Sequence, residues 1–185
     1  MDIGIVSVRY AKALLKFATE LHMEDAVYND MNILANTYLA VPELRSVLNN
    51  PSLNEGQILS ILFNAAGGEK GVCQPTKRFL SVVQLKHRID ILQFIANSYL
   101  TLYRKQKNIT RSRLITPLEV DSSTEQRMKQ LVEGRTNSNV EFAIQIDPDI
   151  EGGFILEYDT YRLDASSKTQ LLKIRKQFLA DSQTN

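Results

Sequence analysis

The chain has 185 residues, a length that suits one compact domain or two small ones. Apolar residues make up 43% and charged residues 23%, as in ordinary globular proteins, which excludes a disordered or fibrous chain. The 22 basic and 21 acidic side chains leave a net charge of +1, which argues against a protein built mainly to neutralise nucleic-acid phosphates.

The amino terminus runs directly into a helical pattern, without the basic start, apolar core and cleavage site of an export signal. We therefore expect the protein to begin at or near Met1 and to stay in the compartment where it is made. No apolar run approaches the roughly 18 residues that a transmembrane helix needs. The single cysteine allows no internal disulfide, and a reduced thiol fits a bacterial-type cytoplasm.

Helical periodicity predicts six helices in residues 1–107. The expected helices are a first at 5–21, a second carrying the stripe Val27, Met31, Leu34 and Tyr38, a short third at 44–48, a fourth behind a Ser52–Glu55 capping box, a fifth opened by Pro75, and a sixth from about Ile89 to Lys107. Residues 67–71, which are rich in glycine, are expected to form a loop. Short connections between these helices indicate an α-helical bundle.

The pattern changes after Asn108. A strand is expected at 109–115, a helix behind a Ser122–Glu125 capping box, an alternating strand at 140–146, strand residues at 154–156, a tight turn at 158–161, and a last helix capped by Ser167 and Gln170. The pair Gly152-Gly153 is expected to permit a bulge or a close backbone approach. The predicted fold is mainly α, with an N-terminal six-helix bundle (1–107) followed by a small α+β domain (108–185).

No catalytic constellation can be assembled from the sequence. Asp147 and Asp149 flank a proline, a pattern typical of a turn rather than of acid–base or metal chemistry. Cys73 lies near Lys77 and Arg78, whose charges would lower its thiol pKa, but a bystander thiol at a helix start is favoured. Neither histidine has the neighbours of a metal site, and no phosphate-binding glycine motif occurs. We therefore expect no catalytic, cofactor-binding or metal-binding residues.

The first helix carries more apolar surface than one packing partner requires. At about 100° per residue, its apolar side chains span an arc of roughly 220°. Either its own chain covers both sides of the helix, or one side faces the bundle and the other binds a helix of another protein. The side expected to face the bundle comprises Val8, Ala11, Leu15 and Ala18. The side left for a partner comprises Tyr10, Ala13, Leu14 and Phe17.

Several short motifs follow one another in a characteristic order along the whole chain. They are Arg9-Tyr10-Ala11-Lys12-Ala13-Leu14, Asn50-Pro51, Arg88-Ile89-Asp90-Ile91-Leu92, Pro117-Leu118, Gly152-Gly153 and Asp164-Ala165-Ser166. In this order and spacing they resemble the delta subunit of bacterial rotary ATP synthases, a family that includes the mitochondrial oligomycin-sensitivity-conferring protein. Each motif is weak alone, and the joint order makes the resemblance specific.

The resemblance implies a non-catalytic stator subunit of a proton-translocating, F-type ATP synthase. In the family, the six-helix domain binds the N-terminal helix of an α subunit in a groove between the first and fifth helices. The resemblance places this groove in the present chain at Tyr10, Ala13, Leu14, Phe17, Val82 and Val83, with Tyr28 at its rim. No cofactor is implied.

The resemblance also implies that the C-terminal domain binds the C-terminal region of the b-subunit peripheral stalk. The stator would then hold the catalytic head against the torque of the rotor, so that proton flow drives ATP synthesis. The basic side chains of the last helix that would complement the stalk are Lys168, Lys173, Arg175 and Lys176. One copy would act in each complex, at the cytoplasmic face of the bacterial inner membrane, with membrane association only through the complex.

Two rival functions remain open at this point. A small enzyme would use Asp147, Asp149 or Cys73 as a reacting group. A helical scaffold that binds nucleic acid would use the basic residues from Arg104 to Arg113, although the near-neutral charge balance disfavours it.

Overall fold

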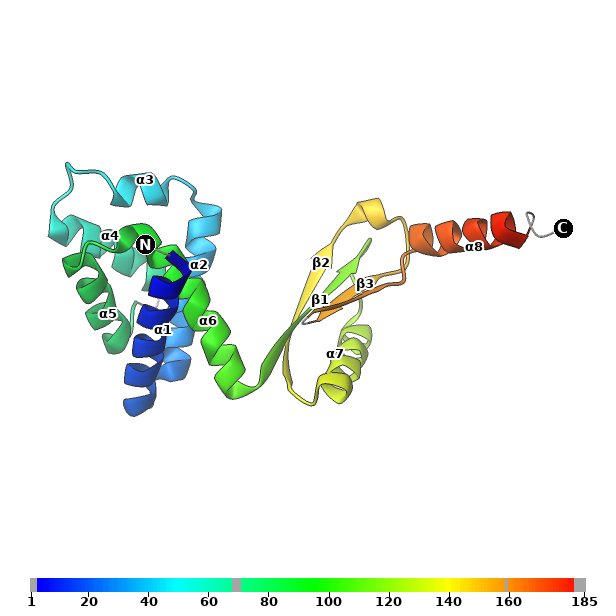
Figure 1. The fold of residues 1–185 in the computed structure, drawn as a ribbon, viewed down its shortest axis with the longest axis horizontal. Coiled ribbons are helices and arrows are strands. Elements are labelled where there is room, and N and C mark those ends of the chain that lie inside the picture. Colours follow the sequence, from blue (N-terminus) through cyan, green and yellow to red (C-terminus); the bar gives the residue numbers. More distant parts are fainter. Residues whose placement is uncertain (1–2, 68–70, 159, 182–185) are drawn as a thin grey trace. The chain divides into compact units, whose positions relative to one another are not determined.

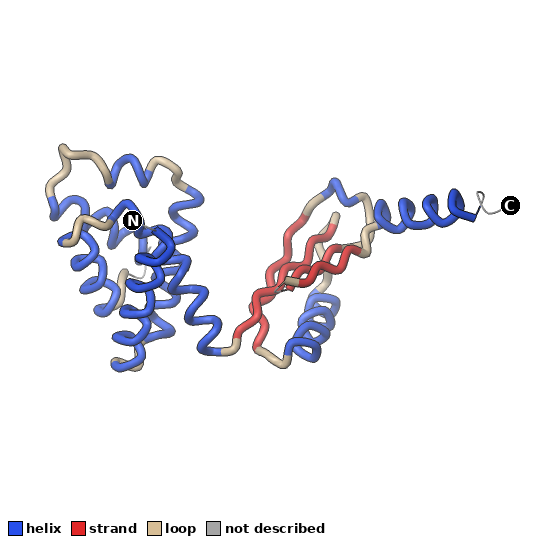
Figure 2. Tube along the Cα trace, in the orientation of Figure 1, coloured by secondary structure: helices blue, strands red, loops and turns tan. Residues whose placement is uncertain are grey.

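The chain divides into two units, Met1–Lys107 and Asn108–Asn185, in the computed structural model. The structure describes residues 3–67, 71–158 and 160–181, and of residues 176–181 only the backbone. It is mainly helical and contains a small mixed sheet of four strands in the described part (Figures 1 and 2). The predicted mainly helical class with a smaller strand-containing part is confirmed.

The first unit contains helices and no described strand. Its elements are α1 (Ile3–Glu20), α2 (Glu24–Ala40), α3 (Leu44–Leu48), α4 (Glu55–Gly67), α5 (Gln74–Leu85), the 3-10 turn η2 (Ile89–Ile91) and α6 (Leu92–Lys107). The loop was expected at residues 67–71, but Gly67 is the last residue of α4, and residues 68–70 lie outside the described part. The sixth helix was expected from about Ile89, but its first turn is 3-10 and regular α geometry begins at Leu92.

Helix α6 lies between α1 and α2, and α2 also packs against α4 (Figure 1). Fully buried side chains from these helices form the core, among them Tyr99, Met31, Leu34 and Leu62. The start of α5 is fixed from a distance, because the backbone N–H of Cys73 donates to the buried Asp30 carboxylate at 3.0 Å. This bond satisfies one of the amide groups that a helix leaves without an internal partner at its first turn.

The capping residues differ from those that the sequence predicts. Asn54, not Ser52, caps α4: Asn54 and Gln57 exchange reciprocal bonds of 2.9 and 2.8 Å. The prediction of Ser52 is wrong because α4 begins at Glu55, so that Asn54 is the residue directly before the helix. In the second unit, Asp121 and Ser166 likewise cap their helices one residue before the serines expected there.

The second unit is a sheet with the order β2-β1-β3-β4. Its elements are β1 (Ile109–Thr116), α7 (Ser122–Thr136), β2 (Asn139–Ile146), the 3-10 turn η3 (Pro148–Ile150), β3 (Ile155–Tyr158), β4 (Tyr161–Asp164) and α8 (Ser167–Asp181). Strands β1 and β2 are parallel, with α7 as the crossover between them, and β3 and β4 add antiparallel neighbours. The expected turn at 158–161 includes Asp159, which lies outside the described residues.

Helix α7 covers one face of this sheet (Figure 1). Val132 of α7 packs with Leu114, Val140 and Leu156 in the main core of the unit. A second cluster combines Ile115, Ile150 and Ile155. Leu114 and Ile115 are neighbours in β1 and point to opposite faces, as the alternation of a strand requires. Both faces of the sheet therefore have an apolar centre.

The glycine pair permits a close backbone approach, as predicted. Gly153 has a φ of +75°, and a Cβ added there would lie 2.3 Å from the carbonyl oxygen of Ala165. Only a residue without a Cβ fits this position without moving the backbone. The approach brings the segment before β3 against the segment before α8, where Ser167 N donates to Gly152 O at 2.9 Å.

We expect Gly153→Ala to destabilise the second unit by about 1–3 kcal/mol or more, because the substitution adds both a steric clash and an unfavourable φ. Hydrogen exchange of the β1 and β3 amides in the full chain measures this loss. The matched control is Gly134→Ala in α7, where no atom lies within 4 Å of an added Cβ. Removing that helix-interior glycine should stabilise the unit by roughly 0.5–1 kcal/mol. Unchanged exchange in Gly153→Ala would contradict the proposed constraint.

Candidate functional site

Helix α1 buries only a narrow stripe of its surface. The buried residues are Ser7, Ala11, Leu14 and Ala18, at successive spacings of four, three and four. Three of them are small, so α1 lies against α6, where Ser98 Oγ is 3.4 Å from Ser7 Oγ. Because the stripe is narrow, much of the apolar arc of α1 remains outside the contact with α6.

The predicted division of α1 into a bundle side and a free side is only partly correct. Ala13 is exposed, and Tyr10 and Phe17 are half-buried, as a partner-facing side requires. Leu14 was assigned to that free side, but only 2% of it is exposed. Val8 was assigned to the bundle side, but 37% of it is exposed. The helix is therefore rotated relative to the prediction, with Leu14 inside.

Helix α5 meets α1 next to Tyr10. The Tyr10 ring lies edge-on to the buried Phe79 ring, with centroids 6.5 Å apart and planes at 71°. One turn after Phe79, Val82 is 48% exposed, whereas its neighbour Val83 is completely buried. The prediction that Val83 lines a partner site is wrong, since that side of α5 faces the core. The remaining residues Tyr10, Ala13, Phe17 and Val82 are called the α1–α5 surface below.

Tyr28, expected at the rim of the groove, packs on α6. Its ring stacks on Tyr103 with centroids 4.2 Å apart, and the Arg104 guanidinium lies over the same ring at 5.4 Å. This places Tyr28 in the seam between α2 and α6, so it is not counted in the α1–α5 surface.

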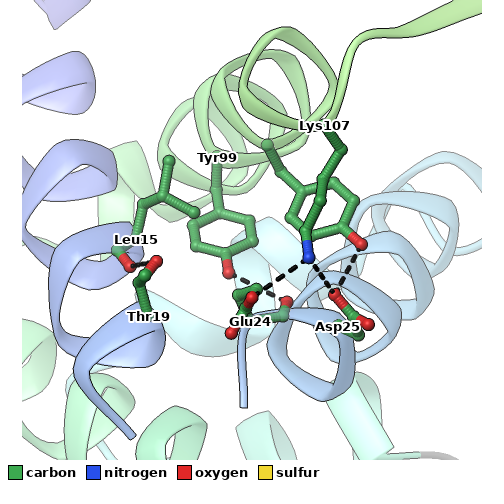
Figure 3. A network of polar contacts seen from close by, with 7 residues as sticks. Leu15, Thr19, Glu24, Asp25, Tyr99 and Lys107 are labelled. Carbon is green, nitrogen blue, oxygen red and sulfur yellow. Dashed lines mark hydrogen bonds and ion pairs between the residues drawn. The ribbon is translucent and has the colours of Figure 1, made fainter. Parts of the chain in front are cut away.

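A polar network joins the start of α2 to the end of α6 (Figure 3). The Tyr99 hydroxyl donates to the Glu24 carbonyl at 3.1 Å, and the Tyr103 hydroxyl donates to Asp25 Oδ1 at 2.8 Å. Lys107 Nζ lies 3.1 Å from Glu24 Oε1 and 3.2 Å from Asp25 Oδ1. These bonds hold the last two turns of α6 on α2, and the five residues are called the α2–α6 network below.

The network shifts the titration of its members in opposite directions. The Tyr103 hydroxyl and then Lys107 lower the pKa of Asp25. The backbone amide of Glu24 and then Lys107 lower the pKa of the Glu24 carboxyl. Burial raises the pKa of Tyr99, and burial together with the bond to Asp25 raises the pKa of Tyr103 to about 12. The carboxylates are therefore held charged and the phenols neutral across the physiological range.

Sequence reasoning missed this network. It considered the basic residues from Arg104 to Arg113 as a candidate nucleic-acid contact. The available signal was the spacing of Tyr99, Tyr103 and Lys107, which recur every fourth residue and so share one face of α6. In the structure, Arg104 lies over the Tyr28 ring and Lys107 pairs with Glu24. Two of the cations that a nucleic-acid contact would use are therefore engaged within the chain.

Helix α8 exposes apolar and basic side chains together. Leu171 is 66% exposed, and Leu172 and Ile174 are each about half exposed. The expected stalk-binding residues Lys168, Lys173 and Arg175 are also exposed, and the side chain of Lys176 lies outside the described part. Figure 1 shows α8 extending away from the end of the sheet. Leu171, Leu172 and Ile174 thus form an exposed aliphatic group on α8.

The face of the sheet opposite α7 carries charged side chains around its apolar centre. Glu157 of β3 pairs with Arg113 of β1 at 2.5 Å and with Arg162 of β4 at 3.1 Å. Arg113 also donates to Gln145 of β2 at 3.1 Å. These cross-strand pairs tie all four strands together on one face.

The side chains considered as reacting groups of an enzyme take part in local structure instead. The Asp147 carboxylate accepts from the Asp149 N–H at 3.1 Å, which is the predicted turn. Burial raises the pKa of the Cys73 thiol, the opposite of what an activated nucleophile needs. Among the described residues, no three acidic, histidine or cysteine side chains are placed to hold a metal ion. No described helix combines the length and apolar character needed to cross a membrane.

Comparison with known proteins gives one family over almost the whole chain. The family model "ATP synthase delta (OSCP) subunit" matches residues 6–178. The ATP synthase subunit delta of Phocaeicola vulgatus is 46% identical over 180 residues, covering 97% of each chain. That of Bacteroides thetaiotaomicron is 40% identical over 179 residues, covering 97% of this chain and 96% of the relative.

A solved structure shares the fold. A chain in the cryo-EM structure of the Toxoplasma gondii mitochondrial ATP synthase hexamer superposes with a TM-score of 0.67 at 22% identity. The match covers 94% of this chain and 97% of that chain.

We expect Tyr103→Phe to lower the free energy of unfolding of the helical unit by about 1 kcal/mol near neutral pH, because Asp25 loses its donor. The folded pKa of Asp25 lies below its ordinary value of 3.8, so its contribution is present above that value and is lost as the pH falls through the folded pKa. The difference between the two proteins should therefore shrink in strong acid.

Urea denaturation of both proteins at neutral and acidic pH, followed by helical circular dichroism, measures this dependence. Tyr161→Phe is the control, since that tyrosine lies in the second unit and is 65% exposed. A difference that persists unchanged in acid would show that the Tyr103 hydroxyl does not act through Asp25.

Proposed function

The chain belongs to the ATP synthase delta (OSCP) subunit family, and we propose that its two units bind two different partners within that complex. Members of this family are non-catalytic stator components of ATP synthase. The first unit, as a six-helix bundle, binds the N-terminal helix of the α subunit at the catalytic head. The second unit binds the C-terminal region of the b subunit in the peripheral stalk.

The α1–α5 surface supports the first contact. Tyr10, Ala13 and Phe17 follow one another at the spacing of neighbours on one helix face, and the exposed Val82 of α5 lies one turn after Phe79, whose ring meets Tyr10. The small Ala13 stands between two aromatic residues, which leaves room for a side chain of an incoming helix. An amphipathic helix docks on such a groove through apolar anchors spaced at i, i+3, i+4 and i+7. Leu14 and Val83 support this surface from the core.

Helix α8 supports the second contact. Its exposed aliphatic residues, Leu171, Leu172 and Ile174, offer a stripe for another helix, and Lys168, Lys173 and Arg175 flank it with positive charge. Basic flanks favour a partner helix that is acidic at the matching positions. The aliphatic stripe provides the attraction at short range, and the cations guide the partner to it.

A stator needs attachment that withstands sustained force. The lifetime of a contact depends mainly on its dissociation rate, which the burial of apolar side chains slows. An adaptor held at two ends also gains from effective concentration, because an end that is released stays near its site. In this role the chain holds the head against rotor torque so that proton flow is coupled to ATP synthesis. It acts as one copy per complex at the cytoplasmic face of the inner membrane.

A peptide copying the N-terminal segment of the cognate α subunit tests the first contact. We expect it to bind the full chain at micromolar concentration, and Val82→Glu to weaken binding at least tenfold, about 1.4 kcal/mol, because the carboxylate would be buried against an apolar helix. Ala13→Glu should act in the same way by filling the gap between the aromatic residues. Isothermal titration calorimetry gives the affinities.

The matched control for this measurement is Val47→Glu on α3, where the valine is 41% exposed and lies outside the α1–α5 surface. It should bind like the unmodified chain. If the peptide does not bind at micromolar concentration, or if Val82→Glu and Val47→Glu bind equally well, the proposed α-subunit contact is wrong.

Substitutions on α8 test the second contact. We expect Leu171→Glu and Ile174→Glu each to weaken binding of the C-terminal segment of the b subunit about tenfold or more, chiefly through faster dissociation. Lys173→Gln should mainly slow association and reduce its dependence on salt. Surface plasmon resonance with the full chain separates the two rates.

Leu39→Glu on α2, where the leucine is 74% exposed, is the control for introducing a carboxylate at an exposed leucine. It should leave stalk binding unchanged. Wild-type rates in both α8 variants would place the stalk contact elsewhere on the second unit.

A further inference from the structure

A cleft of about 490 Å³ opens in the helical unit on residues that belong to neither proposed contact. The end of α3, the turn after it, the start of α4, the end of α5 and η2 line it. Its polar lining residues are Asn49, Asn50, Glu55, Gln84, His87 and Asp90. Its apolar lining residues are Leu48, Pro51, Leu53, Ile58 and Ile89.

Gln84 is the buried polar residue of this cleft. Only 7% of it is exposed, and its Nε2 donates to the Glu55 carbonyl at 2.9 Å. Its other amide atom, Oε1, is buried and has no hydrogen-bond partner among the described residues. An acceptor left in this state carries a desolvation cost, which a donor in the cleft would offset once the Gln84 side chain turns to meet it.

Two carboxylates add negative charge to the same lining. The Glu55 and Asp90 side chains are exposed, and neither forms an ion pair or a hydrogen bond with the described part of the chain. Neither lysine nor arginine is among the residues that line the cleft. No metal-binding group of side chains is present among the described residues, so these carboxylates do not indicate an ion site.

We propose that this cleft binds the guanidinium group of an arginine presented by a protein partner. A guanidinium carries only donors, five N–H groups in one plane, which suits a site with an unpaired acceptor and two carboxylates. The aliphatic stem and the flat face of the group pack on the apolar lining residues, Pro51 and Ile89 among them. The cleft thus adds a polar, charge-selective anchor to a molecule whose two other contacts are mainly apolar.

The residues of the cleft are separate from those of the proposed contacts. None of its lining residues belongs to the α1–α5 surface or to α8. The proposal therefore stands or falls independently of the α-subunit and stalk contacts.

Blocked tripeptides titrated into the full chain test the proposal, with the side-chain amide signals of Gln84 followed by NMR. Acetyl-Ala-Arg-Ala-amide should shift these signals with saturation in the millimolar range. The citrulline peptide, which has the same shape without the charge, and the lysine peptide should bind at least about fivefold more weakly. Free arginine, which lacks the flanking peptide groups of a protein partner, should also bind more weakly than the arginine peptide.

The double variant Glu55→Gln/Asp90→Asn should weaken the arginine peptide about fivefold or more, because it removes the charge and leaves Gln84 in place. Glu20→Gln, an exposed glutamate on α1, is the matched control and should have no effect. Gln84→Met should abolish saturable shifts of the surrounding backbone amides.

Absence of saturable shifts would overturn the proposal and would indicate that water is the partner of Gln84 Oε1. Equal binding of the citrulline or lysine peptide would overturn the guanidinium assignment. Tighter binding of free arginine would overturn the assignment to a protein partner.

Discussion

The packing of α1 on α6 determines which parts of the helical unit remain available to a partner. Because Ser7, Ala11 and Ala18 are small, the contact with α6 occupies little of the circumference of α1. The larger side chains Tyr10 and Phe17 are left at its margin and are half-buried, and Tyr10 meets the Phe79 ring of α5 there. A broader contact would have buried these aromatic residues completely. The close approach of two helices thus produces the apolar surface that a third helix can use.

The last turns of α6 are held by polar contacts as well as by apolar packing. Tyr99 and Tyr103 reach α2 through their hydroxyls, and Lys107 pairs with two carboxylates there. Buried tyrosines supply apolar area and a donor together, so they fix both the distance and the direction of the helix. Helix α6 can therefore support α1 along its whole length up to Lys107, where the first unit ends.

The helices and strands were predictable from the sequence, because the apolar residues that become buried recur at helical spacing in helices and alternate in strands. The caps were not. Near each helix start, several short polar side chains could accept a hydrogen bond from the same amide groups. Which of them caps the helix depends on the folded backbone, and in this structure the capping residues are Asn54, Asp121 and Ser166. The rotation of α1 was also mispredicted, since an apolar arc of roughly 220° does not say which part faces the core. The small side chains of Ser7 and Ala11 could have indicated which side of α1 packs against another helix.

The same reasoning explains why binding residues were harder to assign than elements. Val82 and Val83 are identical in chemistry and adjacent in sequence, yet one is half exposed and the other completely buried. Their roles follow from the packing of Phe79 against Tyr10, a contact between α5 and α1 that no local pattern encodes. Leu171 and Ile174 of α8 show the opposite case, since their apolar spacing alone predicts burial and the described part of the chain leaves them exposed. Apolar side chains on a helix with no packing partner in the described part of the chain are what the proposed stalk contact would require.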